Sequence, residues 1–368
     1  MWVRMVTYKI KSMAEINAIP WNGYKVVSTF SGGGGSCLGY RLAGYKVLWA
    51  NEFVEEAQKT YRANHPTTFL NCKNIREVTA EEVLQESGLK VGEIDLFDGS
   101  PPCSGFSMAG IRERGWGKAK KYSDNKKERV DDLFFEYTRL IRGLKPKVFV
   151  AENVKGLVQG KAKGYFKLIL QEMIDCGYVV KAKLLDASWL GVPQRRQRVI
   201  FMGVRKDLAE KYNVVPTFPT PLDYTITLGE ALNGVKNDDA ELEVLRAQAE
   251  KYAWGKVLKR IKKNPKRPLQ GTKFMGGSYF NLVRESLYKP CSTVCQLNGN
   301  RSASGNCHPL EDRKFTIAEL KRITSVPDDF VLTGNYERQW ERLGRMVPPM
   351  MMYYVAKTIE TQILRKIC

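Results

Sequence analysis

Short apolar runs alternate with amphipathic stretches along the chain up to about residue 205. The apolar runs predict strands over residues 25–30, 46–50, 94–97, 147–151, 179–185 and 199–204. Apolar positions three or four residues apart predict helices over residues 37–43, 53–64, 133–143 and 166–176. Because strands and helices alternate, we expect a doubly wound α/β domain, a fold that places its chemistry at the carboxyl ends of the strands.

The pattern changes near residue 205. Prolines at positions 216, 219 and 221 crowd together, and glycine and lysine become frequent. We expect a boundary there, followed by a smaller, irregular, mostly β module over residues 206–334. An apolar helix over about 350–365 is expected to return to the first domain. The large domain is therefore predicted to comprise residues 1–205 plus 335–368, and residues 1–23 receive no role.

The composition indicates a globular protein with a polyanionic partner. The chain has 368 residues, a net charge of +20 and eight cysteines. Nucleic acid is the default partner for such a charge, although a generally basic proteome would give the same balance. The cysteines are scattered, which favours a reducing cytoplasm. We find no run of 18 apolar residues and therefore expect no membrane span, and without an apolar signal core we do not expect export. The spacing of Cys291, Cys295, Cys307 and His308 fits no standard metal site, so no metal is expected.

A glycine-rich stretch, Ser31-Gly-Gly-Gly-Gly-Ser36, separates the first strand from the first helix. Its spacing is not the G-x-G-x-x-G of dinucleotide enzymes. Glu52 ends the second strand, about 20 residues further on, where a carboxylate can accept both hydroxyls of a ribose. A ribose without a pyrophosphate fits S-adenosylmethionine. A tight turn beside a surface glutamate is the alternative.

Three further stretches carry candidate chemistry. Cys103 follows the strand at 94–97 and the rigid pair Pro101-Pro102, and Glu152 follows the strand at 147–151. Both side chains are expected to face one pocket, with Cys103 as a nucleophile. Arg196 and Arg198 are two residues apart at the start of a predicted strand and would point to the same side. Each has a structural alternative, such as a small buried cysteine or a solvated carboxylate.

From about Val26 to its C-terminus the sequence resembles the DNA cytosine-5 methyltransferases of bacterial or phage type. The matching motifs are Phe30-Ser-Gly-Gly-Gly-Gly35, Glu52, Gly99-Ser-Pro-Pro-Cys-Ser-Gly-Phe-Ser107, Glu152-Asn-Val154, Gln194-Arg-Arg-Gln-Arg198, the stretch from Arg313 to Phe330, and Gly344-Arg-Met-Val-Pro-Pro349. The resemblance implies a Rossmann-like S-adenosylmethionine-dependent methyltransferase domain, a small target-recognition domain and a final helix that rejoins the large domain.

The resemblance also implies roles for individual residues. The expected cofactor-binding residues are Phe30, Ser31, Gly32, Gly33, Gly35, Glu52, Phe53, Asn74, Ile75, Ser100, Pro102, Leu133, Arg345 and Val347. The expected catalytic residues are Cys103, Glu152, Arg196 and Arg198. The expected DNA-binding residues are Arg112, Arg114, Gln194, Lys259, Lys262, Lys263 and Lys273.

The chemistry of cytosine supports the catalytic roles. C5 is too weak a nucleophile to take a methyl group unaided, whereas addition of a Cys103 thiolate to C6 gives an enamine that is nucleophilic at C5. Protonated Glu152 can donate to ring N3, and the two arginines can fix the base carbonyl or nearby phosphates. The target base has to leave the helix stack to reach Cys103.

Two stretches are expected to contact DNA. Residues 104–129 form a long basic loop, interpreted as a lid, with a disordered surface tip over 118–128 as the alternative. Between Lys251 and Arg284 there are ten Lys or Arg and no Asp or Glu. A helix over 251–263 is predicted there, with one apolar face and one face for phosphates. The DNA sequence it recognises cannot be read from the chain.

Two positions depart from the family pattern. Asn74 stands where the family usually has an Asp that holds the adenine amino group, and Arg345 stands where it usually has Asn. We hypothesise that Arg345 pairs with the methionine carboxylate of the cofactor, or otherwise turns to a phosphate.

Other readings stay open on the sequence alone. An RNA-acting member of the family is one, although its Cys-Phe-Thr tripeptide is absent. A catalytically silent DNA-binding relative is another. An adenine or cytosine-N4 methyltransferase would place an aromatic residue where Cys103 stands. The expected enzyme is a monomer acting on double-stranded DNA, with or without a cognate restriction endonuclease.

Overall fold

The computed structural model describes residues 8–102, 120–121, 127–128, 132–159, 162–272, 279, 281–296 and 305–367. The chain forms two compact units. The sheet unit comprises Ile16–Leu185, Gln197–Thr220 and Met352–Cys368. The helical unit comprises Met1–Glu15, Asp186–Arg196 and Pro221–Met351. Each unit is described by itself.

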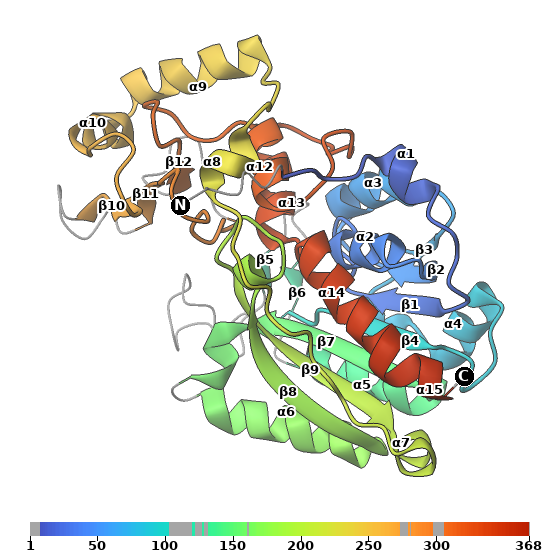
Figure 1. Cartoon of the computed structure of the whole chain (residues 1–368). Helices are drawn as coiled ribbons and strands as arrows, with labels where there is room; N and C mark the ends of the chain where they lie inside the picture. The colour runs from blue at the N-terminus through green and yellow to red at the C-terminus, as the bar shows by residue number, and fades with distance from the viewer. Residues whose placement is uncertain are drawn as a thin grey trace. The chain divides into compact units, whose positions relative to one another are not determined.

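A seven-stranded sheet, in the order β3-β2-β1-β4-β7-β9-β8, forms the centre of the sheet unit (Figure 1). The strands are β1 (Lys25–Thr29), β2 (Lys46–Asn51), β3 (Phe69–Asn71), β4 (Leu96–Gly99), β7 (Val148–Val154), β8 (Tyr178–Asp186) and β9 (Gln197–Arg205). Neighbours from β3 to β7 pair in parallel, and β9 runs antiparallel to β7. The chain reverses its direction of travel across the sheet between β1 and β4, the switch point where such folds bind ligands.

Helices cover the sheet because its central strands are apolar on both faces. They are α2 (Gly35–Leu42), α3 (Glu55–Asn64), α4 (Ala80–Ser87), α5 (Leu133–Leu144), α6 (Lys163–Asp175) and α7 (Lys206–Tyr212), with short 3-10 turns at Ile75–Glu77 and Lys155–Val158. One apolar cluster joins the sheet to α4, α5 and α6 and is built around Phe97, Tyr137, Phe149 and Phe201. The doubly wound α/β expectation is confirmed.

The C-terminal helix α14 (Pro349–Ile359) continues through Glu360–Leu364 into α15 (Arg365–Ile367). Met352, Val355 and Ile359 on this helix are fully buried. The Tyr45 hydroxyl donates to the Ala356 carbonyl at 2.9 Å. The final helix therefore packs against the sheet unit, as the apolar pattern of its sequence predicts.

The helical unit contains more helix than strand among its described residues. Its helices are α8 (Leu228–Leu232), α9 (Asp239–Lys251), α10 (Ala253–Arg260), α12 (Ile317–Ile323) and α13 (Tyr336–Arg345). Its sheet has three short strands, β10 (Leu269–Gln270), β11 (Leu282–Arg284) and β12 (Gly305–Cys307). The expectation of a mostly β module over 206–334 is therefore wrong. Capping boxes at Thr227 with Glu230 and at Thr316 with Glu319 start α8 and α12, two helices that the apolar pattern does not predict.

The helical unit has its own core and its own buried charge. Trp254, Leu258 and Leu282 pack together in it. Arg284 is fully buried, donates to the Leu258 carbonyl at 2.8 Å, and pairs with Asp312. Arg284 lies on β11, so its hydrogen bond to the Leu258 carbonyl ties β11 to α10.

Some expectations concern domain bounds that the structure does not test, or residues outside the described part of the chain. The bounds 1–205 plus 335–368 and 206–334, drawn from the change in sequence pattern near residue 205, stay a prediction. Within the segment expected as a lid, β5 (Lys120–Lys121) pairs antiparallel with β6 (Lys127–Glu128). Arg112 and Arg114 lie outside the described residues. No helix in the described part of the chain is long and apolar enough to cross a membrane.

Candidate active site

The glycine-rich loop after β1 is held in an unusual backbone conformation. Phe30, Gly32 and Gly34 have φ values of 53°, 57° and 91°. A Cβ at Gly34 would collide with the buried His65 ring, so this position requires glycine. A Cβ at Gly32 would meet nothing within 4 Å. The loop backbone at Gly32 therefore borders open space that a ligand can occupy.

Glu52 at the end of β2 ties the loop to the next helix. Its Oε2 accepts from the Gly32 N–H at 2.7 Å, and its Oε1 accepts from the Val54 N–H at 2.7 Å. The residue is 8% exposed. A carboxylate oxygen can accept more than one hydrogen bond, so both oxygens retain capacity for hydroxyl donors. The geometry suits a ribose at this position, with Phe53 next to Glu52 half-buried.

The stretch after β3 is fastened to the start of α5. Asn74 Oδ1 accepts from the Arg76 N–H at 3.1 Å and caps the short turn that begins at Ile75. Arg76 in turn pairs with Asp132 at 2.6 Å, directly before Leu133. Ile75 and Leu133 are both buried in the core cluster of the sheet unit. The three expected cofactor residues of this region thus lie in one connected part of the sheet unit.

The segment that leads from β4 toward Cys103 is held by the end of β7. Gly99 has to be glycine because a Cβ would collide with the Tyr137 ring. The Asn153 side-chain N–H donates to the Pro101 carbonyl at 3.0 Å. Ser100 and Pro102 are half-buried, and Cys103 lies outside the described residues. Sequence reasoning noted Asn153 inside a motif but gave it no function; in the structure it positions the Pro101-Pro102 backbone.

Glu152 and Arg198 form an ion pair across β7 and β9. Arg198 Nε lies 2.7 Å from Glu152 Oε1, and both side chains are largely buried. Arg198 pairs with Val154 in the antiparallel register, so Glu152, two residues earlier on β7, is its diagonal neighbour on the same face. Two of the four residues expected to be catalytic, Glu152 and Arg198, are therefore in direct contact.

Arg196 does not share this position. It precedes β9, which begins at Gln197, and it belongs to the helical unit. Its guanidinium donates to the carbonyls of Val294 and Gly344 at 3.1 and 2.9 Å, and the residue is 3% exposed. The expectation that Arg196 and Arg198 point the same way from one strand is wrong, because the strand starts one residue after Arg196.

Gln194 is fully buried, and its Oε1 accepts from the Val294 N–H at 3.2 Å. These contacts join residues 194–196 to the segment around Val294 within the helical unit. Because the Gln194 side chain is buried, the structure does not support the expected contact with DNA.

Arg345 at the end of α13 already has a carboxylate partner. Its guanidinium lies 2.9 Å from Glu341 Oε1, one helical turn earlier. The neighbouring Gly344 lies against the Cys295 backbone, and Val347 is 7% exposed. The hypothesis that Arg345 needs the cofactor carboxylate as its counter-charge loses its main argument, because the chain supplies that charge.

Comparison with known proteins agrees with this geometry. Residues 24–361 match the family of C-5 cytosine-specific DNA methylases. The chain belongs to the C-5 cytosine-specific DNA methylases. It is a DNA (cytosine-5-)-methyltransferase, as the resemblance implied.

Curated relatives and solved structures are similar to this methylase over most of their length. Type II methyltransferase M.NgoFVII of Neisseria gonorrhoeae is 30% identical over 95% of this chain and 89% of its own. Type II methyltransferase M.Sau96I of Staphylococcus aureus is 29% identical over 96% and 79%. A candidate DNA modification methyltransferase encoded within an E. coli prophage shares the fold, with a TM-score of 0.69, 21% identity, and coverage of 93% of this chain and 99% of its own.

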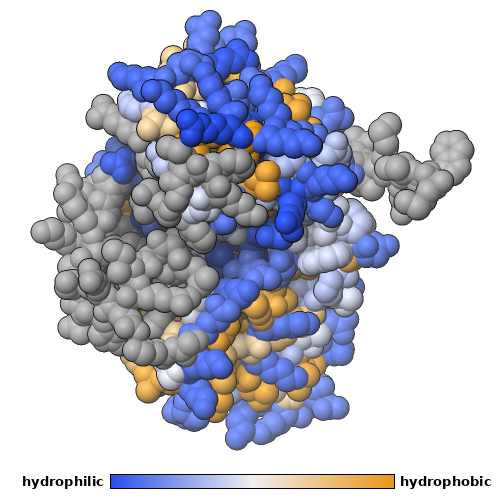
Figure 2. Space-filling view, turned by 90° about the vertical axis from the view of Figure 1, so that its left-hand side faces the viewer, coloured by the Kyte–Doolittle hydropathy of each residue, from blue (hydrophilic) through white to orange (hydrophobic). Residues whose placement is uncertain are grey.

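The basic residues of the methylase that were expected to contact DNA lie partly in the described chain. Lys259 pairs with Glu250 at 2.6 Å, and Lys263 lies 3.5 Å from Asp312. Both lysines and Lys262 are exposed at or after the end of α10, whose apolar face is buried as predicted. Lys273 lies outside the described residues. Figure 2 shows a face of the molecule on which hydrophilic residues predominate, with an apolar group in its lower part.

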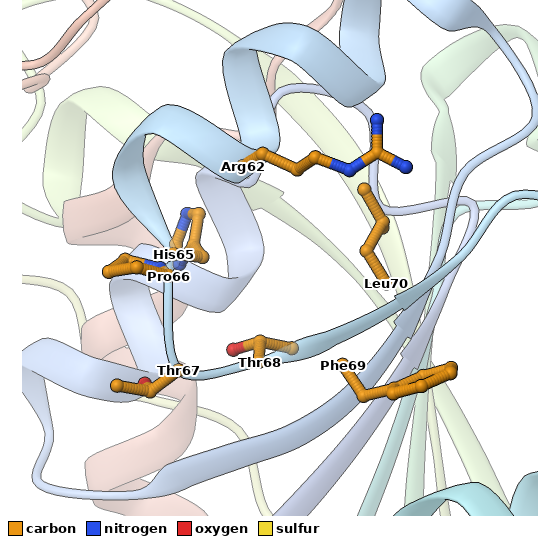
Figure 3. A pocket seen from close by; sticks show the side chains of 7 residues that line it. All are labelled: Arg62, His65, Pro66, Thr67, Thr68, Phe69 and Leu70. Atoms are coloured by element: carbon orange, nitrogen blue, oxygen red, sulfur yellow. The ribbon is translucent and has the colours of Figure 1, made fainter.

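A pocket of the methylase opens beside the edge strand β3, which begins at Phe69 and ends at Asn71 (Figure 3). It is lined by Arg62, His65, Pro66, Thr67, Thr68, Phe69 and Leu70. Neither Glu52 nor Glu152 lines this pocket, but the His65 ring also lies against Gly34 of the glycine-rich loop.

Proposed function

We propose that this methylase transfers a methyl group from S-adenosylmethionine to C5 of a cytosine flipped out of double-stranded DNA, through a covalent bond between Cys103 and C6. The observation that carries the proposal is the 2.7 Å ion pair of Glu152 and Arg198, beside the Asn153–Pro101 hydrogen bond. Together they hold a carboxyl group and the backbone that precedes Cys103 at the ends of neighbouring strands, β7 and β4.

The residues at the glycine-rich loop fit S-adenosylmethionine. The open backbone at Gly32, together with the remaining acceptor capacity of Glu52, suits a ribose without a pyrophosphate. Phe53, Asn74, Ile75 and Leu133 would complete the adenosine side of the site. When bound, this cofactor supplies an electrophilic methyl group on a sulfonium. Arg345, paired with Glu341, is not required for charge balance there.

The chain's own residues would activate the base. The Cys103 thiolate forms a bond to C6, and a proton from Glu152 on N3 neutralises the developing negative charge, which makes C5 nucleophilic. Arg198 keeps the Glu152 carboxyl in one orientation, a positioning effect that a flexible side chain could not supply. After methylation, water takes the C5 proton, the Cys103–C6 bond breaks with departure of the thiolate, and N3 returns its proton to Glu152, which restores the aromatic ring.

The DNA-binding role rests on charge. With 20 more basic than acidic residues, the methylase is suited to a polyanion, and the residues around α10 offer lysines to phosphates. Its relatives M.NgoFVII and M.Sau96I are Type II methyltransferases. We therefore place this enzyme in a restriction-modification context in the cytoplasm, as a monomer with or without a cognate endonuclease, with the helical unit reading the target sequence.

The test combines product mapping with trapping. Cells expressing the wild type or Cys103→Ser are compared by bisulfite sequencing, and Cys176→Ser serves as a matched control for a cysteine away from the site. Methylated cytosine at one recurring sequence is expected with the wild type and the control only. DNA carrying 5-fluorocytosine at that sequence should form a gel-stable adduct. Methylation of cellular RNA without DNA methylation, or no adduct, would overturn the proposal.

A further inference from the structure

Asp98 is a buried carboxyl group directly beneath the glycine-rich loop. It lies on β4 at the switch point of the sheet and is 2% exposed. Its Oδ2 accepts from the Ser28 hydroxyl on β1 at 2.8 Å, and its Oδ1 accepts from the Tyr40 hydroxyl on α2 at 2.8 Å. The Ser31 hydroxyl donates to Ser28 Oγ at 2.9 Å. A chain of hydroxyl groups therefore connects Asp98 to the loop itself.

The surroundings of Asp98 contain acids and hydroxyls. Burial raises the pKa of Asp98 to about 7, hydrogen bonds from Tyr40 and Ser28 oppose the rise, and the charge of Glu152 adds to it. Within the described chain, the other titratable groups that act on it are Cys37 and Tyr40 from α2 and Tyr137 from α5. None of these groups is a cation. The carboxylate is thus a buried negative charge that the sheet unit leaves without a counter-charge among these neighbours.

We propose that Asp98 is a positioning residue of the cofactor loop that releases its proton when the positively charged cofactor binds and takes a proton back when the neutral product has formed. The proposal rests on S-adenosylmethionine being the cofactor. The sulfonium is a fixed positive charge that the product lacks, and an opposite charge favours the ionised carboxyl group. In a buried environment that interaction is only weakly screened.

The proton state of Asp98 also sets the direction of the hydroxyl chain. An ionised carboxylate accepts from Ser28, which leaves Ser28 Oγ as an acceptor for Ser31. A protonated Asp98 can donate to Ser28, which can then donate to Ser31 in turn. Loss of the Asp98 proton therefore reorients the Ser31 hydroxyl in the glycine-rich loop. This gives charged cofactor and neutral product two different forms of the same loop.

Calorimetry in two buffers tests the proposal. Binding of S-adenosylmethionine and of S-adenosylhomocysteine to the purified protein is measured at pH 7 in phosphate and in Tris, whose ionisation enthalpies differ. An acid with a pKa near the pH of the experiment is about half protonated, so the wild type should release up to about half a proton with the cationic ligand. It should release clearly less with the neutral one. In Asp98→Asn the difference between the two ligands should shrink to the part that comes from the ligands' own amino groups.

A second variant covers the case in which Asp98→Asn fails to fold. Tyr40→Phe removes one hydrogen bond that lowers the pKa of Asp98, so the pH at which proton release is greatest should move upward. The sulfonium lowers the pKa of the ligand's own amino group, so this contribution differs between the two ligands, and the difference that remains in Asp98→Asn measures it. If the wild type binds S-adenosylmethionine but Asp98→Asn and Tyr40→Phe leave proton release unchanged, the role of Asp98 is wrong. If no variant and no wild type binds the cofactor, the proposed function fails instead.

Discussion

Arg198 Nε lies 2.7 Å from Glu152 Oε1, on the diagonal of the antiparallel pair β9 and β7. These residues are 46 positions apart in sequence and come from motifs that the family resemblance treats separately. Through this ion pair, Arg198 holds the Glu152 carboxyl group in place. Because β9 runs antiparallel to β7, the start of β9 lies beside the end of β7, which brings Arg198 next to Glu152.

Replacing Arg198 by Met should therefore slow methyl transfer through Glu152. A positioned general acid contributes typically about 10²–10⁴-fold, so a loss of at least about 10² in kcat is expected. S-adenosylmethionine affinity should change little. Arg205→Met, which removes an arginine paired with Asp207 at the far end of β9, is the matched control and should leave kcat near that of the wild type. Equal rates for Arg198→Met and the control would show that the ion pair has no role in the reaction.

Glu52 should control cofactor affinity through two kinds of contact. Glu52→Ala removes any hydroxyl contacts and also the bonds to the Gly32 and Val54 N–H groups. Hydrogen bonds to a charged group are worth about 1.5–3 kcal/mol, so S-adenosylmethionine should bind at least about tenfold more weakly in calorimetry. Glu55→Ala on the exposed start of α3 is the control. Unchanged affinity in Glu52→Ala would remove Glu52 from the cofactor site.

The lysines at and just after the end of α10 should contribute to the affinity for DNA of any base sequence. Substituting Lys259, Lys262 and Lys263 by Gln should weaken cognate and unrelated DNA about equally, and lower the salt slope by about 0.9 for each lost phosphate contact. Glu250→Gln releases Lys259 from its ion pair and should strengthen DNA binding. A loss confined to the cognate sequence would mean that these lysines read bases.

Arg345 is now expected to matter little to the cofactor. Because Glu341 already pairs with Arg345, Arg345→Asn should leave S-adenosylmethionine affinity within about twofold of the wild type. Arg345→Glu places two carboxylates one helical turn apart and should destabilise α13 by about a few tenths of a kcal/mol. Calorimetry and the thermal midpoint separate the two effects. A large loss of cofactor affinity in Arg345→Asn would restore the original hypothesis.

Asp98 and Glu285 should each contribute stability to the ligand-free protein that is lost as the pH rises from about 4 to about 7, whereas the buried His65 and His308, whose pKa values are lowered, contribute in the opposite direction. Burial raises the pKa of Asp98 from 3.8 to about 7 and that of Glu285, in the helical unit, from 4.5 to about 7. In this range these two carboxyl groups hold more protons in the folded state than in the unfolded state, so each pH unit removes part of their contribution to stability, and the trend ends above about pH 7. Between pH 5 and 7 the thermal midpoint of Asp98→Asn with Glu285→Gln should fall less, or rise more, with increasing pH than that of the wild type. Parallel pH curves would contradict the assignment.

Apolar periodicity predicted the elements of the sheet unit well. Runs such as 147–151 and 199–204 became central strands because burial on both faces leaves a nearly continuous apolar signal. The strand β3 is only Phe69–Asn71 and has too short a pattern to be recognised. In the helical unit the caps at Thr227 and Thr316 would have been the useful signal, since α8 and α12 are too short to show clear periodicity.

The site was predicted less completely than the fold. Motifs named Glu52, Glu152 and Arg198, but the roles of Asn153 and Asp98 depend on partners 52 and 58 to 70 residues away in the chain. Such pairings follow from strand order, which one sequence does not state. Arg196 shows the opposite error, because the alternation rule was applied one residue before the strand begins.

The place of α14 in the sheet unit has a consequence for how the enzyme is made. Residues such as Val355, Ala356 and Ile359 are fully buried, and Tyr45, near the start of the sheet, hydrogen-bonds to this last helix. On the ribosome, the surface that receives α14 stays uncovered until α14 itself has emerged. The early strands are therefore exposed to chaperones and proteases until about 300 more residues have been made. A chain that stops before α14 should be degraded, which would keep partially made methylase from accumulating in the cell.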